Sequence, residues 1–441
     1  MDLERCALQR RDEEPAESLR ISSSSWSFVM TSILQPASSS TKLLPRLRQA
    51  VGGGGRDTRL VAMVIVLALI WLCANAVTNG VFLSPRNLFN LSLQVSVVAI
   101  MASGMILVIV TRHIDLSVGS QVGFLGVLGG LVQSSWLSDS MHAWWISCLV
   151  MLTGGMFIGL LQGALVAYAR IPSFVVTLGG LLFLRNAAYE LNDGTTIAPL
   201  SATFQNLGGG QNGVLGAALS WAAAAAVTAY IVFNLVRRYQ RKKFLGVQNP
   251  LTAFDGVSAA LWCVCAFGLV AVMNSYKRPG TTESMGLAVP VLILIAVTTL
   301  MTIIAKKHRF GRHVFAVGGD PLSARLTGIN TQRVVLKVFV LMGFLSGLAS
   351  IVLTARLNAA ASGAGTMMEL YVIAAAVIGG TSLAGGAGTI LGGCVGALIM
   401  QSLQSAMVLM GIASPLQSMV LAGVLVLAVW IDTMWRERRP S

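Results

Sequence analysis

Residues 88–111 read LFNLSLQVSVVAIMASGMILVIVT and contain no charged side chain. A helix needs about 20 apolar residues to cross the hydrocarbon core of a bilayer, and this stretch supplies them. The segment from Leu116 to Trp136 follows it closely and is also uncharged. The two segments therefore predict successive membrane-spanning helices.

The composition extends this interpretation to the whole chain. Of its 441 residues, 55% are hydrophobic and 11% are charged, against about 25% charged residues in soluble domains. These proportions exclude a soluble enzyme, a disordered chain and a nucleic-acid-binding domain. They predict an all-α, polytopic membrane protein with about twelve transmembrane helices, in a range of about ten to twelve.

Polar, glycine and proline residues mark the ends of the apolar segments. We expect helices at 59–77, 88–111, 116–136, 144–168, 173–190, 214–236, 256–274, 285–305, 334–356, 369–378, 389–410 and 415–434. The segment at 369–378 is short. We therefore expect one discontinuous helix or re-entrant segment there.

The net charge of +14 comes from basic residues between the apolar segments. The three main clusters are Arg237, Arg238, Arg241, Lys242 and Lys243; Lys306, Lys307, Arg309 and Arg312; and Arg436, Arg438 and Arg439. Basic residues anchor the cytoplasmic ends of membrane helices. Twelve crossings place all three clusters and both chain termini on the cytoplasmic side.

The domain organisation follows from this pattern. Residues 1–58 are rich in serine and arginine and predict a disordered cytoplasmic tail, within which Met1 and Met30 are both candidate starts. Residues 59–435 form the transmembrane domain, with a cytoplasmic loop at 306–333. Residues 436–441 form a second cytoplasmic tail.

The cytoplasmic loop contains FGRHVFAVGGDPLSARLTGIN at residues 310–330. Asp320 is a favourable N-cap, and Pro321 suits the first helical position because its missing N–H has no partner there anyway. Gly328 is placed to end the helix in the left-handed conformation. The loop therefore predicts a short capped helix, which is either an ordinary structured turn or a docking site for a cytoplasmic partner.

Four segments together resemble the permeases of ATP-binding cassette (ABC) importers of the ribose, xylose and branched-chain amino-acid type. They are IDLSVGS at 114–120, IPSFVVTLGG at 171–180, the loop at 310–330, and VIGGTSLAGGAGT at 377–389. Within this family, the segment NDGTTIAP at 192–199, an extra helix pair at 214–275 and AVWID at 428–432 resemble the D-xylose type. Arg112 and His113 depart from the smaller or acidic residues of the family.

The resemblance implies a homodimeric pore in a bacterial inner membrane. A separate cytoplasmic ATPase would bind ATP and magnesium, and a periplasmic sugar-binding protein would deliver the substrate. The sequence is consistent with a separate motor, because it has no phosphate-binding G-x-x-x-x-G-K-[ST] loop. Residues expected to couple the pore to the ATPase are Gly318, Gly319, Asp320, Pro321, Ala324, Arg325 and Gly328.

Two segments are candidates for a gate or hinge. Asp115 can cap a helix that starts at Leu116, and five glycines at 377–389 are too many for a regular helix interior. The turn at Asp115 can also be purely structural, and the glycine segment is either a re-entrant loop or a break between two helix halves. The gate and hinge candidates are Asp115, Ser117, Gly119, Gly379, Gly380, Thr381, Ser382 and Gly385.

A neutral pentose needs a pathway of hydroxyl and amide groups rather than charges. Candidate lining residues are Asn90, Gln94, Ser96, Ser173, Thr177 and Asn186, each of which can equally bond a neighbouring helix. The four histidines do not pair with cysteine or acidic residues at metal-binding spacing, so no metal site is expected.

Two other classes of function remain open. A secondary sugar transporter or channel would work without ATP, although a proton-coupled carrier usually has several carboxylates within the membrane. An intramembrane enzyme would need a nucleophile and base, and no such pairing is visible. The sugar also remains open among xylose, ribose, arabinose and galactose.

Overall fold

The computed structural model describes residues 57–137, 140–210, 213–244, 253–278 and 280–437. The tail predicted at 1–58 lies outside this description up to residue 56, and residues 57 and 58 already belong to the first described helix. The tail predicted at 436–441 begins inside the last helix, and residues 438–441 lie outside the description.

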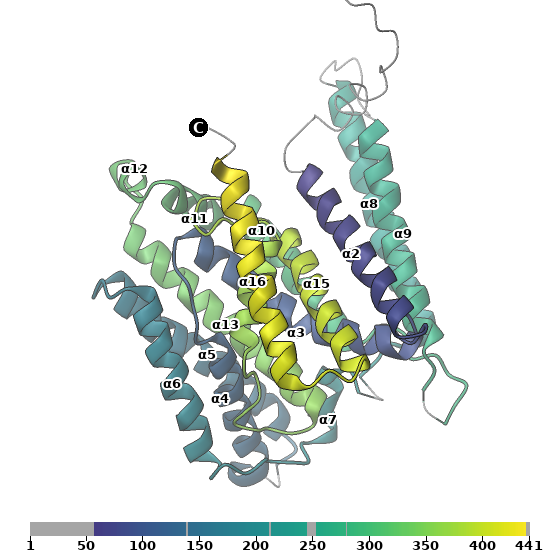
Figure 1. Cartoon of the computed structure of the whole chain (residues 1–441), viewed down its shortest axis with the longest axis horizontal. Helices are drawn as coiled ribbons and strands as arrows, with labels where there is room; N and C mark the ends of the chain where they lie inside the picture. Colours follow the sequence, from purple (N-terminus) through teal and green to yellow (C-terminus); the bar gives the residue numbers. More distant parts are fainter. Residues whose placement is uncertain (1–56, 138–139, 211–212, 245–252, 279, 438–441) are drawn as a thin grey trace, which may run out of the picture. The chain divides into compact units, whose positions relative to one another are not determined.

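The described residues are mainly helical (Figure 1). The helices are α2 (Asp57–Val77), α3 (Pro85–Val110), α4 (Val118–Leu131) with the π-helical turn η1 (Val132–Trp136), α5 (Ala143–Ala167), α6 (Ser173–Leu191), α7 (Ala202–Gln205), the 3₁₀ turn η2 (Asn206–Gly208), α8 (Gly216–Phe244), α9 (Ala253–Ser275), α10 (Val289–Lys306), α11 (Arg309–Gly319), α12 (Pro321–Leu326), α13 (Thr331–Leu357), α14 (Met368–Ile378), α15 (Ile390–Leu409) and α16 (Ser414–Glu437). Each apolar segment predicted from the sequence overlaps at least one of these helices.

Within the described ranges, seven helices are long and apolar enough to cross a membrane. They are α3, α5, α6, α8 as far as Arg241, α10, α13 and α15. Shorter apolar helices cover Ala62–Val77, Trp262–Ser275, Met368–Ile378 and Ser414–Trp430. These helices support an all-α, polytopic membrane fold.

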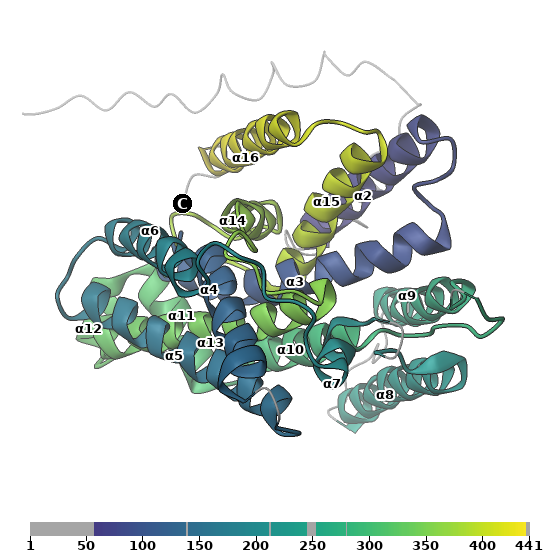
Figure 2. The ribbon, with the colours of Figure 1, turned by 90° about the horizontal axis from the view of Figure 1, so that it is seen from below.

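Helix α3 occupies the centre of the core, in contact with α10, α13, α14 and α15 (Figure 2). Its residues from Val95 to Val110 are all buried. A helix that is apolar on every side is stable when other helices or lipid surround it, and here other helices do. This position explains why the run at 88–111 lacks charge.

Helices α5 and α13 make the most extensive helix pair of the core. Gly155 and Gly159 lie against the backbone of α13 at Gly343 and Phe339, so that a β-carbon at either position would overlap a carbonyl oxygen. Small residues four positions apart let membrane helices approach closely. The four-residue glycine spacing of the sequence is therefore a packing device here.

Two ends of this helical unit can be defined from its contacts. At one end, named here the α12 end, Val110 meets Gly318 and Gly386. At the other end, named the opposite end, Asn358 accepts a hydrogen bond from the Leu200 amide. Figure 1 shows the last turn of α16 at the same end as α12.

The chain between α13 and α15 runs from the opposite end to the α12 end, first without helical structure, then as helix α14, and then again without helical structure. Residues 358–367 are not helical, and Ala360 pairs with Ile197 at the opposite end. Helix α14 follows, and the non-helical segment 379–389 then reaches Val110, which accepts a hydrogen bond from the Gly386 amide at 3.0 Å. The short helix expected at 369–378 is thus present as α14, with non-helical residues on both sides of it.

The structure corrects two local predictions. The 306–333 loop contains a second helix, α11, whose buried Val314 and Val317 lie on one face. The other correction concerns Asp115: α4 starts at Val118 rather than Leu116, and its N-cap is Ser117. Asp115 instead accepts hydrogen bonds within the turn before α4, because its short side chain reaches the amide two residues ahead.

Candidate functional site

Helix α12 is capped at both ends by the residues that were predicted to cap it. The Asp320 carboxylate accepts a hydrogen bond from the Leu322 amide at 2.9 Å, and Pro321 begins the helix. Gly328 has a φ of +86°, in the left-handed region. The predicted capped helix is confirmed.

The carboxyl group of Asp320 also accepts a hydrogen bond from the Ser323 hydroxyl. This bond and the one from the Leu322 amide hold the pKa of Asp320 below its usual value, with a smaller contribution from the charge of Arg112. The carboxylate is therefore ionised at neutral pH, as an N-cap at the positive end of a helix should be.

The outer face of α12 is apolar. Leu322 is 68% exposed and Leu326 is 81% exposed, whereas Ala324 is buried. The two leucines are four residues apart and therefore share one face of the helix. This exposed leucine pair, on a capped helix outside the apolar spans, is a candidate contact surface.

The predicted coupling glycines differ in whether their surroundings leave room for a side chain. A β-carbon on Gly318 would overlap the Val110 carbonyl oxygen, so only glycine fits. A β-carbon on Gly319 would have no neighbour within 4 Å, and Arg325 is exposed. Gly318 is thus the residue that joins this loop to α3.

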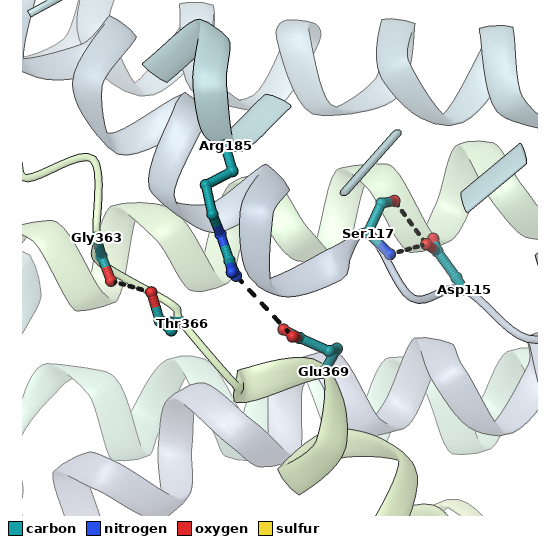
Figure 3. A network of polar contacts seen from close by, with 6 residues as sticks. All are labelled: Asp115, Ser117, Arg185, Gly363, Thr366 and Glu369. Atoms are coloured by element: carbon teal, nitrogen blue, oxygen red, sulfur yellow. Dashed lines mark hydrogen bonds and ion pairs between the residues drawn. The ribbon is translucent and has the colours of Figure 1, made fainter. Parts of the chain in front are cut away.

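Asp115 and Ser117 belong to a buried polar cluster (Figure 3). Asp115 accepts hydrogen bonds from the Ser117 amide at 2.9 Å and from the Ser117 hydroxyl at 2.6 Å. Gln121 of α4 and Gln162 of α5 both donate to the Ser117 oxygen at 2.8 Å. Ser117 therefore connects the turn before α4 to α5.

Gly119 lies against a second cluster, which consists of the charged residues Arg185 and Glu369. A β-carbon there would be 2.5 Å from the Gly365 carbonyl oxygen and would overlap the Glu369 carboxylate. Arg185 of α6 points toward Glu369 in Figure 3, with its Nη2 atom 3.9 Å from Oε1. Gly119 thus allows the start of α14 to approach α4, and Arg185 reaches the same carboxylate from α6.

The ion pair between Arg185 and Glu369 is incompletely satisfied. Arg185 Nη2 and Glu369 Oε2 are buried atoms with no hydrogen-bond partner among the described residues. The side chain of Glu369 is 8% exposed. A buried, loosely paired charge is costly, and such charges in membrane proteins commonly mark functional sites.

The 379–389 segment is shaped by close backbone contacts. A β-carbon on Gly379 would lie 2.5 Å from the Gly392 carbonyl oxygen. Gly380 and Gly385 have φ values of +95° and +88°. Thr381 is buried, and its hydroxyl has no partner within the described part of the chain. Ser382 donates its amide to the Ala387 carbonyl.

The six pathway candidates do not form one cluster. Ser173 and Thr177 lie together beside Ile114, where the Ser173 hydroxyl accepts a hydrogen bond from the Ile114 amide at 3.3 Å. Asn186 is exposed on α6 and donates to its own helix. The remaining three lie in the first half of α3: Asn90 is exposed, Gln94 is half-buried, and the buried Ser96 hydroxyl donates to the Ser92 carbonyl.

The structure adds four residues that the sequence interpretation did not select: Gln121, Gln162, Arg185 and Glu369. Each is a strongly polar side chain within a helix of mostly apolar residues. That rarity was a usable signal. Their pairing was not predictable, because the partners lie 41 and 184 positions apart in the sequence.

The chain matches the model of the family described as branched-chain amino acid transport system / permease component over residues 87–429. This match includes the turn at Asp115, α12 and the segment around α14. The chain belongs to this permease family. The family assignment made from the sequence motifs is confirmed.

Individual relatives agree with this assignment. The xylose transport system permease protein of Haemophilus influenzae is 37% identical over 385 residues, which cover 86% of this chain and 96% of the relative. Its counterpart in Escherichia coli K12 is 35% identical over 87% of this chain and 93% of the relative. The ribose import permease protein of the same strain is 33% identical, with coverages of 85% and 92%. No solved structure matches the chain.

Proposed function

We propose that this permease is the transmembrane subunit of an ABC importer and forms the translocation pathway for D-xylose. The observation that carries the proposal is α12, a capped helix with Leu322 and Leu326 exposed on one face. These leucines would dock into a cytoplasmic ATPase subunit. That subunit would bind ATP and magnesium and supply the energy for transport.

We infer about twelve membrane crossings, with α4 and η1 as one crossing and residues 358–378 as another. The location of the last turn of α16 at the α12 end supports this count (Figure 1). An even number of crossings from a cytoplasmic start leaves the C-terminus in the cytoplasm. The proposed location is the bacterial inner membrane, with the basic residues near Lys306 on the inner side.

A second copy of the chain would complete the pore. Helix α6 supports this because Asn186 is exposed on it among apolar side chains such as Leu182 and Phe183. An amide facing lipid is unfavourable, whereas a facing copy would provide a polar pathway between the two α6 helices. A periplasmic sugar-binding protein would dock at the opposite end, near Leu200 and Asn358.

The gate of the proposed pathway would lie where α4 meets α14. Gly119 brings Glu369 against α4, and Ser117 connects the preceding turn to Gln162 on α5. The glycines of 379–389 would allow α14 to move at its other end. A shift of α14 relative to α4 would therefore change the environment of Arg185 and Glu369.

Xylose is proposed over ribose on two grounds. The xylose permeases of H. influenzae and E. coli are 37% and 35% identical to this chain, against 33% for the E. coli ribose permease. The second ground is the hairpin of α8 and α9, which corresponds to the extra helix pair of the xylose type (Figure 2). Both grounds favour xylose as the substrate.

The test is uptake of labelled xylose by cells that lack the endogenous chain. Expression of this chain with its ATPase and binding protein should restore uptake, and excess unlabelled xylose should compete better than ribose, arabinose or galactose. Deletion of the ATPase should abolish the restored uptake. Better competition by ribose would reassign the substrate.

A secondary transporter is the alternative function, and the buried Glu369 carboxylate is the observation that favours it. A proton-coupled carrier would use such a group as its proton carrier. Undiminished uptake without the ATPase, combined with a requirement for Glu369, would support this alternative and reject the ABC importer.

A further inference from the structure

Arg112 lies two residues beyond the end of α3, in an uncommon backbone conformation. Its φ is +66°, in the left-handed region that L-residues with a β-carbon rarely adopt. Strained positions of this kind persist when surrounding contacts hold them. The contacts of the Arg112 side chain therefore show which interactions hold this backbone conformation.

The guanidinium of Arg112 binds the last carbonyls of α11. Its Nε donates to the Gly318 carbonyl at 2.9 Å, and its Nη2 donates to the Gly319 carbonyl. The last carbonyls of a helix lack partners within the helix and carry partial negative charge. Arg112 thus caps α11 at the junction where α12 begins, although in the chain it lies just after the C-cap of α3.

The aliphatic part of Arg112 contacts a third segment. A β-carbon on Gly385 would be 2.5 Å from Arg112 Cγ and 2.6 Å from the Gly318 carbonyl oxygen. The Gly386 amide donates to the Val110 carbonyl at 3.0 Å. The end of α3, the end of α11 and the glycine loop after α14 therefore meet around one side chain.

We propose that Arg112 is a positioning residue that transmits movement of the α11–α12 segment to α3 and to the 379–389 loop. The proposal rests on the proposed function, in which an ATPase moves α12. Displacement of α12 would pull Gly318 and Gly319, and the two hydrogen bonds would carry this pull to Arg112. The side chain would then push against Gly385, in the loop that follows α14.

Arginine suits this role better than lysine. The planar guanidinium can donate to two carbonyls at once from a rigid fork, whereas an ammonium group is a compact point charge. Gly318 and Gly319 present adjacent carbonyls, which match the fork. The role therefore predicts partial rather than full retention of function by lysine.

The experiment uses the complete complex of this chain, its ATPase and its binding protein in proteoliposomes. Xylose uptake and ATP hydrolysis are measured together, with and without xylose-loaded binding protein. Arg112→Met keeps the aliphatic stem and removes both hydrogen bonds, and Arg112→Lys keeps the charge. Arg86→Met, at the other end of α3 and exposed, is the matched control.

Arg112→Met should keep the ATPase bound but lower xylose uptake per ATP hydrolysed about ten-fold, with an intermediate ratio for Arg112→Lys. A wild-type ratio in Arg112→Met would overturn the proposal. If Arg112→Met does not reach the membrane, a wild-type ratio in Arg112→Lys overturns it instead. Absence of ATP-dependent uptake in the wild-type complex is a separate result, which rejects the proposed function itself.

Discussion

Gly155 of α5 and Gly343 of α13 face each other so closely that a β-carbon on either one would overlap the carbonyl oxygen of the other. Neither backbone can yield easily, because both residues lie within long helices. This contact sets the separation of the most extensive helix pair in the core.

Gly343→Leu should force α5 and α13 apart and lower the free energy of unfolding by about 1–3 kcal/mol, as overpacking does in other cores. Thermal unfolding in detergent, followed by size-exclusion chromatography, measures the effect. Gly179→Ala is the control, because a β-carbon there has no neighbour within 4 Å. Equal stability of the two variants would contradict the packing role of Gly343.

The second prediction concerns the ion pair of Arg185 and Glu369. Arg185→Met should destabilise the protein, because it leaves the Glu369 carboxylate buried without its cation. The double variant with Glu369→Gln should recover part of the loss, with a coupling of about 1–3 kcal/mol. A double-mutant cycle on unfolding temperature measures this coupling, and strictly additive effects would show that the pair is not coupled.

Asp115 allows stability and gating to be separated. Asp115→Ala removes the acceptor of both Ser117 hydrogen bonds, whereas Asp115→Asn keeps an oxygen that can accept them. We expect about ten-fold lower uptake for alanine at a similar protein level, and a smaller loss for asparagine. Normal uptake at a normal protein level for Asp115→Ala would remove Asp115 from the gate.

The leucines of α12 predict how the ATPase binds. Leu322→Ser combined with Leu326→Ser should leave the fold intact, since both side chains are exposed, and should reduce co-purification of the ATPase at least about five-fold. Leu409→Ser, a change at a partly exposed position at the end of α15, is the comparison. Full retention of the ATPase by the double variant would exclude this face as the docking surface.

The cap at Asp320 predicts that ATPase binding is insensitive to pH near neutrality. Its pKa is held below the ordinary value of an aspartate by the Ser323 hydroxyl and then by the Leu322 amide. A carboxyl group with a lowered folded-state pKa contributes stability above its unfolded-state pKa, and this contribution is lost as the pH falls through the folded-state value. ATPase binding should therefore stay constant from about pH 8 to about pH 5.

Substitution at the same residue provides the matching test. Asp320→Asn should retain ATPase binding, because asparagine is also a favourable N-cap, whereas Asp320→Ala should weaken it. Binding is measured by co-purification at about pH 7. Equal loss in both variants would assign the effect to the charge of Asp320 rather than to its cap.

The sequence alone determined where the long apolar helices lie and how α12 is capped. Apolar runs such as residues 88–111 are so unfavourable in water that they must be buried or cross a membrane, whatever their neighbours. The Asp320 cap joins atoms two positions apart, so Pro321 and Gly328 suffice to predict it. Helix α11 escaped prediction because it is short and its exposed face carries Arg309 and Arg312, so that the segment resembles a basic loop.

Only the tertiary structure decided which helix faces meet. Arg185 and Glu369 are far apart in the sequence, and nothing local distinguishes their pairing from contact with lipid or another helix. The same holds for Gly155 with Gly343 and for the three segments around Arg112. Hydrophobicity acts on area and has no direction, whereas these contacts depend on the rotation and offset of whole helices, which are set by the packing of the complete core.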